Sequence, residues 1–596
     1  MPDLLVVGGA SIDKLHIGGQ VVPSAGGTGL YTALAARRCG AQVELYGPRP
    51  DRMPEILRPA AERLSGWLGP LFPEEEIAHF EISHVGDHAN YIYYSAGKEA
   101  EIDPNGLPAD LSSYDLVHVT AMGNALQQRA FFQACLARGA RRISAGTFLK
   151  DVQEHSRVVK ETLELADIFF MNEQEAAGIF GSPEEAGARP GQLLFITRGK
   201  NGVTVVQGSQ RTCIPALSAE ALDPTGAGDT FCGAALAHLL NGRHPVMAAG
   251  LAARLAAQEI TLPGPQALLL NDPLPGIALD ERVRVNENQV GAVSAVVKSL
   301  EAAAPFDFTG AHLPPKGHPA ALDYFFAVTL QQFGFWETAG GRYERPMIAP
   351  LNGDMLKGST YLYRAFLRPL DNDTDFYSPE RQANLTRDKL LAVLRADDCS
   401  DPMPALDLHL EMARAYGRDM MALGLTPRTL LERARPSATP LLELLNSLDH
   451  IGGYKEDPLR KKSSLLALSL NQRPEGFLRF GDGESVAPVI DYHAMRGCLR
   501  SGLVEVLYED LYEKLATRRE LEPDEEGAVR LAAYQAVERV VEVSGKSLGA
   551  VDWFFFNYLR ALCPEMSAPR CAECALDKVC AKRKELFQPV FRTTFY

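Results

Sequence analysis

The first 265 residues alternate short, continuous apolar runs with longer segments of helical spacing. A strand that is covered on both faces reads as a continuous apolar run, and helices between such strands make a parallel sheet. The alternation therefore predicts a doubly wound α/β domain, which binds its ligands at the carboxyl ends of the strands. The predicted strands are 3–9, 114–120, 142–145, 168–171 and 193–197.

The second half of the chain has long segments of helical periodicity and few strand signals. Between the halves, residues 266–286 are rich in proline and lack helical spacing, which is typical of a linker. We therefore expect a domain at 1–265, a linker at 266–286 and a mainly helical domain at 287–596. The clearest predicted helices are 388–394, 407–423, 428–433, 502–517 and 528–543.

Length, composition and charge narrow the class of protein. A chain of 596 residues is too long for a single core, and 46% hydrophobic with 23% charged residues is a soluble globular composition. A net charge of −15 disfavours binding to long nucleic acids but allows a small anionic substrate. The chain has no apolar run of membrane-spanning length, and its first residues read as a strand rather than a signal segment. We expect a cytoplasmic protein without a membrane partner; no oligomeric state follows from the sequence.

The segment 222–231 carries the strongest chemical signal. Gly226, Ala227 and Gly228 precede Asp229 at the start of a small-residue helix. Free backbone N–H groups and the positive end of the helix dipole make an anion site there. In phosphoryl transfer the three small residues would hold the migrating group while Asp229 accepts a hydroxyl proton. The alternative is a glycine-rich turn that only caps the helix.

Other polar residues and glycines follow predicted strands. Asp13 comes after the first strand, and the pair Gly26 and Gly27 precedes an alanine-rich helix, where it lets the backbone lie close to a ligand. Asn172 and Glu175 follow the strand at 168–171, and their oxygen atoms suit magnesium. As alternatives, Asp13 is a turn carboxylate and Asn172 is a helix N-cap.

These segments, in this order, resemble the signatures of the ribokinase (PfkB) family of sugar and nucleoside kinases, over nearly all of residues 1–265. The resemblance implies ATP and Mg²⁺ as the cofactors. It implies that Asp13, Gly26 and Gly27 hold the hydroxyls of the acceptor, although family members usually carry Asn where this chain has Thr28. It also implies an ATP and magnesium site made by Asn172, Glu175, Thr197, Gly199 and Gly202.

Four of the ten cysteines form a C-x7-C-x2-C-x5-C string near the chain end: Cys563, Cys571, Cys574 and Cys580. Four thiols in one loop can bind a tetrahedral metal centre, and a cytoplasmic setting disfavours disulfides. The spacing resembles the 4Fe–4S loop of endonuclease III-type DNA glycosylases, with one extra residue in the first gap. The resemblance implies a 4Fe–4S cluster that fastens the chain end, with Zn²⁺ as the alternative.

The helical half also resembles the queuosine salvage family, whose members are queuosine-5′-phosphate N-glycosidases on a DNA-glycosylase-like helical fold. That family lacks the cysteine loop. The resemblance spans most of residues 285–596 and rests on short motifs in the expected order. These motifs are FGFW at 333–336, KLLAVLRAD at 389–397, RKK at 460–462, VIDY at 489–492, GLV at 502–504, VDW at 551–553 and FRTTFY at 591–596.

Cleavage of a ribosyl N-glycosidic bond passes through an oxocarbenium-like state that a buried carboxylate can stabilise. The resemblance gives Asp491 this role. A flat base needs an aromatic platform and a 5′-phosphate needs a cation. The candidates are Phe335 and Trp336 for the base, and Lys461, Lys462 and Arg592 for the phosphate. As alternatives, the aromatics belong to the core, the basic run is a solvated patch and Asp491 is a surface carboxylate.

Together the two halves predict a bifunctional salvage enzyme. The first would phosphorylate a nucleoside, for which queuosine is the candidate, at its 5′ position, and the second would hydrolyse the product to release the base, queuine. One alternative is a kinase fused to an iron–sulfur DNA-repair glycosylase, but no Leu-Pro-Gly-Val-Gly hairpin precedes Asp491. Another is a kinase fused to a module that binds a nucleotide without cleaving it.

Overall fold

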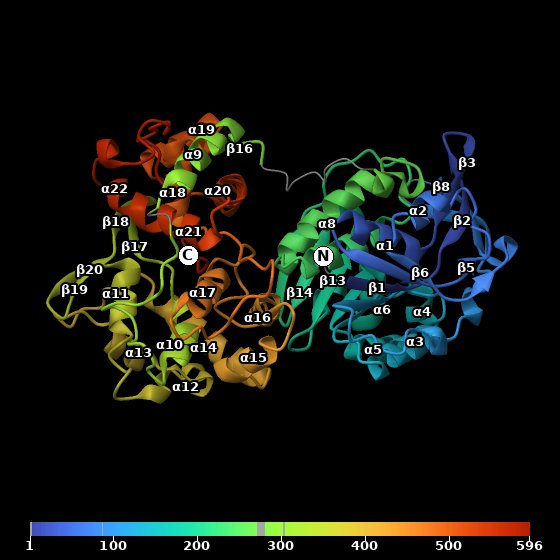
Figure 1. Ribbon diagram of the computed structural model, residues 1–596, viewed down its shortest axis with the longest axis horizontal. Coiled ribbons are helices and arrows are strands. Elements are labelled where there is room, and N and C mark those ends of the chain that lie inside the picture. Colours follow the sequence, from blue (N-terminus) through green and yellow to red (C-terminus); the bar gives the residue numbers. More distant parts are fainter. Residues whose placement is uncertain (1–2, 86–87, 271–279, 302–303) are drawn as a thin grey trace. The chain divides into compact units, whose positions relative to one another are not determined.

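The computed structural model describes residues 3–85, 88–270, 280–301 and 304–596. Contacts divide the chain into two compact units, Met1–Ile277 and Ala278–Tyr596 (Figure 1). The division falls inside the predicted linker 266–286, of which residues 271–279 lie outside the described residues. The ends of that segment are structured, as a 3₁₀ helix at Gly264–Leu269 and a strand, β16, at Val283–Val285.

The first unit is built on a nine-stranded sheet in the order β15-β14-β13-β12-β11-β10-β1-β4-β6. Seven strands are parallel, and β14 and β15 add an antiparallel edge. The predicted α/β fold is confirmed, with each predicted strand in this sheet. The strands are β1 (Asp3–Val7), β4 (Gln42–Tyr46), β6 (Gly66–Leu68), β10 (Leu116–Val119), β11 (Ile143–Ala145), β12 (Ile168–Asn172), β13 (Leu193–Thr197), β14 (Val203–Gln207) and β15 (Gln210–Ile214).

Helices cover both faces of this sheet. Leu4 and Val6 of β1 share a core with one helix layer, and the alternate residues Leu5 and Val7 share a core with the other. This alternation explains the unbroken apolar runs, because successive strand residues point to opposite, equally covered faces. The first layer contains α1 (Thr28–Arg38), α7 (Ala227–Leu240) and α8 (Pro245–Glu259); the second contains α3 (Ala125–Ala137), α5 (Ser156–Leu165) and α6 (Glu173–Phe180).

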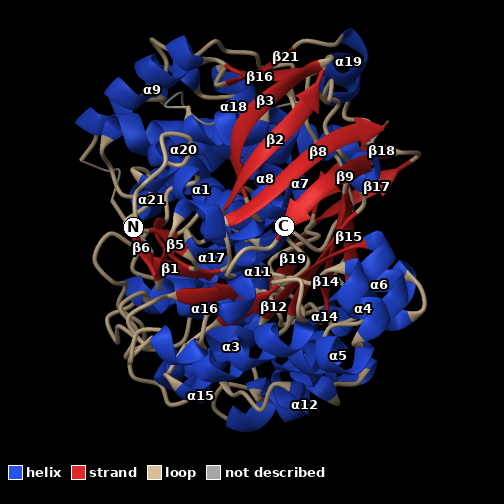
Figure 2. Ribbon diagram, turned by 90° about the vertical axis from the view of Figure 1, so that its right-hand side faces the viewer, coloured by secondary structure: helices blue, strands red, loops and turns tan. Residues whose placement is uncertain are grey.

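A smaller four-stranded sheet, in the order β3-β2-β8-β9, completes the first unit (Figure 2). The antiparallel pairs are β2 with β3 and β8 with β9, while β2 and β8 are parallel. The strands are β2 (Ser11–Ile17), β3 (Gln20–Gly26), β8 (Ala78–Val85) and β9 (His88–Ser95). Because β2 follows β1 almost directly, this sheet begins at the carboxyl end of a central strand, where a ligand is expected.

The second unit is mainly helical, as the sequence predicts. The helices expected at 388–394, 407–423, 428–433 and 528–543 are α13 (Arg387–Leu394), α14 (Leu406–Ala422), α15 (Pro427–Ala434) and α20 (Pro523–Ser544). The other helices of this unit include α9 (Glu287–Ser299), α10 (Ala321–Thr329), α11 (Gly358–Ala365), α12 (Pro379–Ala383), α16 (Pro440–Leu448), α17 (Lys461–Gln472), α18 (Tyr492–Ser501), α21 (Leu548–Trp553) and α22 (Leu559–Leu562).

One helix prediction is wrong in its first half. The segment 502–517 contains α19 (Glu509–Thr517), but it begins with a strand, β21 (Val504–Val506), that pairs antiparallel with β16. Two further hairpins are β17 (Trp336–Ala339) with β18 (Arg342–Pro346) and β19 (Ile348–Leu351) with β20 (Asp354–Lys357). Of the helices that the structure describes, none is both long and apolar enough to cross a membrane.

The close packing of α1 and α7 in the first unit depends on Gly233. A Cβ atom at this position would lie 2.0 Å from the carbonyl oxygen of Thr32, which is backbone and cannot rotate away. By contrast, Gly250 of α8 has open space where its Cβ would point.

We expect Gly233→Ala to lower the melting temperature although alanine favours helices, because α1 and α7 must move apart. Overpacking of this kind costs about 1–3 kcal/mol, or roughly 2–10 °C in a unit of this size. Gly250→Ala should be neutral or stabilising, because alanine lowers the entropy cost of helix formation without a clash. Thermal unfolding followed by circular dichroism compares the two variants, and equal effects would contradict the packing argument.

Candidate functional site

The predicted anion loop of the first unit lies at the start of α7. Gly226 precedes the helix with φ 82° and ψ 0°, and a Cβ atom there would come within 2.4 Å of the Tyr31 ring. Only glycine therefore fits both the backbone and the space. A Cβ at Gly228 would meet nothing within 4 Å, and no side chain caps the helix. The first N–H groups of α7 have no intrahelical acceptor, the Ala227 N–H makes only a long bond of 3.4 Å to the carbonyl oxygen of Pro224, and the space beside Gly228 is open.

Asp229 lies in the first turn of α7, beside these N–H groups. Burial raises the pKa of Asp229 to about 7, and the negative charge of Glu175 adds to the shift. Burial also raises the pKa of Glu175 to about 7, against the opposing effect of its hydrogen bonds. Asp229 can therefore accept a proton near neutral pH, which a carboxylate of ordinary pKa does poorly.

Asp13 lies within β2, on the smaller sheet, and is 3% exposed, so the turn-carboxylate alternative is not observed. Burial raises its pKa to about 7. A Cβ at Gly26 would lie 1.8 Å from Oδ2 of Asp13, and Gly27 adopts φ 98° at the start of α1. The pKa of Tyr91 on β9 is raised by partial burial and then by the charges of Asp229 and Asp13, which indicates that these groups face one region.

The predicted nucleotide residues lie at the ends of adjacent strands, where Asn172 of β12 pairs with Thr197 of β13. Asn172 is an N-cap, as the structural alternative proposed. Its Oδ1 accepts the N–H groups of Gln174 and Glu175, both at 2.9 Å, while Oε2 of Glu175 accepts the N–H of Asn172 at 2.8 Å. This capping box rigidly fixes the position of Glu175 relative to the strand end.

Gly199 and Gly202, the two glycines of the predicted ATP site, have positive φ angles of 52° and 87°. A Cβ at Gly202 would lie 2.0 Å from the carbonyl oxygen of Ile214, so this glycine is required by close packing. Gly199 has open space around it. The structure therefore leaves room for a ligand at Gly199, whereas Gly202 serves the fold.

Oxygen donors suited to magnesium gather near the loop, namely the carboxylates of Glu175 and Asp229. Within the described part of the chain, no group of three or more His, Cys, Asp or Glu side chains is arranged to hold a metal ion. Magnesium would therefore rely on water and phosphate oxygens for most of its ligands, which is its usual manner of binding.

The second unit contains a cavity of about 270 Å³. Phe335, Lys461 and Asp491 line it, together with His493 and Asp552. The structure thus brings together three of the six residues predicted for the base and phosphate site, and they come from segments that are far apart in the sequence.

The other three predicted residues lie away from the lining of this cavity. The Arg592 guanidinium lies 4.1 Å over the Trp336 ring and donates to the carbonyl oxygen of Trp336 at 2.7 Å. Nζ of Lys462 lies 5.2 Å from the centre of the Phe333 ring and donates to the carbonyl oxygen of Leu330 at 3.2 Å. These cations are engaged within the fold of the second unit.

Asp491 is a buried N-cap rather than a surface carboxylate, with 9% of its surface exposed. Its Oδ1 accepts the N–H groups of His493 at 2.8 Å and Ala494 at 2.9 Å, the first turn of α18. Both bonds fall on the same oxygen, so Oδ2 is left outside them. Burial raises the pKa of Asp491, while the charge of Lys461 and the two N–H bonds oppose the rise.

Lys461, the first residue of α17, is 5% exposed, so it does not belong to a solvated patch. Its Nζ donates to the carbonyl oxygen of Gln332 at 2.9 Å. Burial lowers the pKa of Lys461 to about 8, and the negative charge of Asp491 opposes this shift. Burial and then the charge of Asp491 raise the pKa of Asp552 well above its ordinary value. The cavity thus holds two interacting carboxylates and an ammonium group.

Two aromatic residues of this cavity were not predicted. The rings of Phe306 and Trp553 are stacked, with centroids 4.3 Å apart and planes inclined by 6°. A flat base suits such a surface. Asp552 and Trp553 belong to the VDW motif at 551–553, for which no role was expected. A signal was present, because Asp552 is a lone acid within a run of aromatic and apolar residues.

The four cysteines near the chain end line a second, smaller cavity of about 40 Å³. The guanidinium of Arg500 donates to Sγ of Cys563 at 3.3 Å, and Sγ of Cys580 donates to the carbonyl oxygen of Arg500 at 3.5 Å. All four thiols are free and half-buried. Since no arrangement suited to a single ion was found among the described residues, the thiols as they lie do not form a closed mononuclear site.

Two family models match the chain. Residues 75–272 match the pfkB family carbohydrate kinase, and residues 312–568 match the queuosine salvage protein. The chain is a PfkB carbohydrate kinase domain followed by a queuosine salvage protein domain. The kinase match contains Asn172, Glu175 and the Asp229 loop. The salvage match contains Asp491 but ends before the last three cysteines.

Known relatives cover the PfkB domain. A cytidine kinase of Thermococcus kodakarensis is 26% identical over 255 residues, or 41% of this chain and 90% of the relative. A ribokinase of Bacillus subtilis is 29% identical over 256 residues, or 41% of this chain and 84% of the relative. Among solved structures, the Burkholderia thailandensis nucleoside kinase in complex with inosine has a TM-score of 0.38 at 21% identity, and the match covers 44% of this chain and 93% of that one. The chain is thus a PfkB-type nucleoside or sugar kinase fused to a queuosine salvage domain.

The raised pKa of Asp229 predicts how the stability of the ligand-free PfkB domain depends on pH. A carboxyl with a folded-state pKa near 7 and an unfolded value near 4 binds more protons when folded, so stability falls as pH rises between these values. Asp229→Asn removes the titrating carboxyl and with it this decrease in stability. We expect its melting temperature to exceed that of the unsubstituted protein by a margin that grows from about pH 5 to about pH 8.

Thermal unfolding in buffers of equal ionic strength measures this margin. Asp51→Asn, at an exposed carboxylate of the same domain, is the matched control and should show no such trend. A constant difference for Asp229→Asn across this range would contradict the pKa assignment.

Proposed function

We propose that this chain is a bifunctional salvage enzyme. Its PfkB domain phosphorylates the 5′-hydroxyl of a nucleoside, for which queuosine is the candidate, with ATP. Its queuosine salvage domain then hydrolyses the N-glycosidic bond of the 5′-phosphate and releases queuine with ribose 5-phosphate. The observation that carries the proposal is Asp491, a buried helix N-cap whose carboxylate lines a cavity of about 270 Å³ together with Lys461 and aromatic rings.

The first step uses the start of α7. Asp229, with a pKa of about 7, takes the proton of the acceptor hydroxyl, whose oxygen attacks the terminal phosphorus of ATP as the bond to ADP breaks. The N–H groups at Gly226, Ala227 and Gly228 stabilise the charge of the migrating group, and that of Ala227 exchanges its long bond to Pro224 for the ligand. Asp13, held beside Gly26, binds acceptor hydroxyls. When bound, magnesium would supply charge neutralisation between the phosphates, held through Glu175 and water.

The second step uses the cavity beside α18. Asp491 stabilises the positive charge that develops on the ribose as the bond to the base breaks, and it takes a proton from the attacking water. Lys461 lowers the pKa of Asp491 and so favours its charged form. The stacked pair Phe306 and Trp553 offers a flat surface to the base. Water adds to the sugar carbon, and the departing base takes a proton, so the products are queuine and ribose 5-phosphate.

A nucleoside acceptor is supported by the second domain, which belongs to a family that takes a 5′-phosphorylated nucleoside. The names of two relatives of the first domain, a cytidine kinase and a nucleoside kinase in complex with inosine, agree with such an acceptor. Joining the two activities in one chain raises the local concentration of the phosphorylated intermediate around the second domain.

Two single substitutions separate the steps. Asp229→Asn should slow phosphorylation of queuosine by about 10²–10⁴-fold because the proton acceptor is lost. It should still release queuine from queuosine 5′-phosphate that is supplied directly. Asp491→Asn should phosphorylate queuosine normally and accumulate the 5′-phosphate, with queuine release slowed to a similar degree. Mass spectrometry of timed reactions with Mg-ATP measures all three compounds.

The matched control is Asp510→Asn, at an exposed carboxylate of the second domain, which should leave both rates unchanged. Release of queuine from queuosine without ATP at the full rate would overturn the two-step order. Unchanged queuine release by Asp491→Asn would show that this carboxylate is not the catalytic group.

We also propose that Cys563, Cys571, Cys574 and Cys580 hold a 4Fe–4S cluster. The support is their common cavity and the spacing of the string. Arg500 donates to the Cys563 sulfur and so places a positive charge beside the proposed cluster.

Anaerobically purified protein is expected to be brown and to contain about four irons and four sulfides per chain. Cys571→Ser and Cys574→Ser should each reduce the iron content severely. Cys399→Ser, at an exposed cysteine of the same domain, should not. Elemental analysis and visible absorbance make the measurement. One zinc per chain in place of iron would overturn the cluster assignment and support the alternative metal.

A further inference from the structure

Helix α18 borders both cavities of the second unit. Its N-cap, Asp491, lines the larger cavity, while Gly497, Arg500 and Ser501, further along the same helix, line the cavity of the four cysteines. The helix has only ten residues, which is about 15 Å of helix length. One short helix, which begins at the proposed catalytic carboxylate, therefore connects the two cavities.

The cysteine loop is fastened to the last turn of α18. Arg500 donates to the carbonyl oxygens of Pro564 at 2.9 Å and Leu586 at 2.8 Å, in addition to its contact with the Cys563 sulfur. The carbonyl oxygen of Arg500 in turn accepts the thiol of Cys580. Arg500 thus contacts the loop on both sides, and two of the four cysteines touch it directly.

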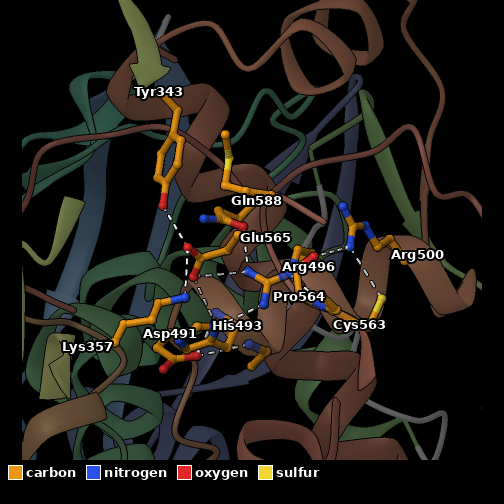
Figure 3. A network of polar contacts seen from close by, with 12 residues as sticks. Tyr343, Lys357, Asp491, His493, Arg496, Arg500, Cys563, Pro564, Glu565 and Gln588 are labelled. Atoms are coloured by element: carbon orange, nitrogen blue, oxygen red, sulfur yellow. Dashed lines mark hydrogen bonds and ion pairs between the residues drawn. The ribbon is translucent and has the colours of Figure 1, made fainter. Parts of the chain in front are cut away.

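The loop also reaches back to the first turn of α18 through Glu565, two residues after Cys563 (Figure 3). Its side chain is 2% exposed. Oε2 accepts the Tyr343 hydroxyl at 2.7 Å and lies 3.1 Å from Nζ of Lys357, while Oε1 lies 3.6 Å from Nδ1 of His493. Glu565 therefore joins the hairpins of the second unit to the helix start.

Arg496 completes the connection from the middle of α18. It donates to the carbonyl oxygen of Cys563 at 3.2 Å and to Nδ1 of His493 at 2.9 Å, and its NH1 lies 3.8 Å from Oε1 of Glu565. The backbone N–H of His493 is one of the two donors to Oδ1 of Asp491. A continuous path of contacts thus runs from the cysteine loop through Glu565, Arg496 and His493 to Asp491.

The charges make this path sensitive to Glu565. Arg496 is buried and the side chain of Lys357 is 30% exposed, and Glu565 is the carboxylate that both cations approach. Removing one charge of a buried network leaves its partners unpaired, which is costly and forces them to move. Substitution of a residue that orients a catalytic group commonly lowers activity by about 10–100-fold. The reason is that a displacement of the catalytic group by about 1 Å disrupts the reacting geometry.

We propose that Glu565 is a positioning residue through which the four-cysteine loop fixes the first turn of α18 and so aims Asp491 into the cavity. The inference rests on the proposed function of that cavity. It assigns the cysteine loop a role in base release beyond fastening the chain end: loss of the loop's order lowers the rate of base release and leaves phosphorylation by the PfkB domain unaffected.

The test compares Glu565→Gln with Glu573→Gln in the full chain. Both change a carboxylate to an amide in the same loop, but Glu573 is exposed and pairs with the exposed Arg570. With queuosine 5′-phosphate supplied directly, Glu565→Gln should lower kcat for base release by about 10–100-fold with little change in KM. The kinase rate of each variant should equal that of the unsubstituted protein. Glu573→Gln should change none of these.

Amide hydrogen exchange gives a readout that does not depend on activity. In Glu565→Gln and in Cys571→Ser, the amides of His493 and Ala494 should exchange about tenfold faster or more, because their bonds to Asp491 open more often. The amides of α7 in the PfkB domain should be unchanged. The proposal would be overturned if Glu565→Gln had the same amide exchange rates and the same kcat as Glu573→Gln.

The two proposals fail in different ways. If the unsubstituted protein releases no base from queuosine 5′-phosphate, the proposed function fails, while hydrogen exchange still decides whether Glu565 orders the helix start. If base is released and Glu565→Gln raises KM without lowering kcat, the residue acts in substrate binding and the positioning role is wrong. Unchanged exchange in Cys571→Ser would break the link between the cysteine loop and α18.

Discussion

Buried carboxylates at helix N-termini are the physical constraint on which both candidate sites depend. Glu175 lies in the first turn of α6, Asp229 in that of α7, and Asp491 caps α18. The N–H groups of a helix start favour the charged carboxylate, whereas burial favours the neutral acid. Burial prevails at all three positions, since each pKa is raised. The result is a set of carboxylates that exchange protons closer to neutral pH than ordinary carboxylates do, in a chain that gives up some stability for them.

The α/β fold of the first domain and five strands of its large sheet could be predicted from the sequence, because their signals are local, whereas the smaller four-stranded sheet could not. A parallel strand covered on both faces is a continuous apolar run, and the glycines of the anion loop stand next to the acid they serve. The errors arose where pairing is long-range. The segment 502–517 has helical spacing, yet Val504–Val506 pairs with Val283–Val285, which lies over two hundred residues earlier in the chain. Likewise, nothing in the neighbourhood of Asp13 indicates that it belongs to a second sheet.

The site of the second domain was harder to predict, because its residues come from separate helices and loops. Lys461 and Lys462 are adjacent in the sequence, and both are buried, but only Lys461 lines the cavity. A helix points successive side chains about 100° apart, so the two cannot share one ligand. Arg592 is drawn to the Trp336 ring by cation–π attraction, a contact between segments over two hundred residues apart. Motif order identified the family, whereas the choice of residues within each motif needed the fold.

The electrostatics of the cavity divide the roles of its two carboxylates. The charge of Asp491 adds to burial in raising the pKa of Asp552, so ionisation of one carboxylate opposes ionisation of the other. Asp491 is the more easily ionised of the two, because the charge of Lys461 and two backbone N–H groups stabilise its anion. For Asp552, the charge of Lys461 alone opposes the effects of burial and of the Asp491 charge. Of the two carboxylates, Asp552 is therefore the one whose neutral form is favoured more strongly. An anion that can stabilise a sugar cation, beside a neutral acid that can protonate a departing base, is the pair of groups that glycosidic bond cleavage requires.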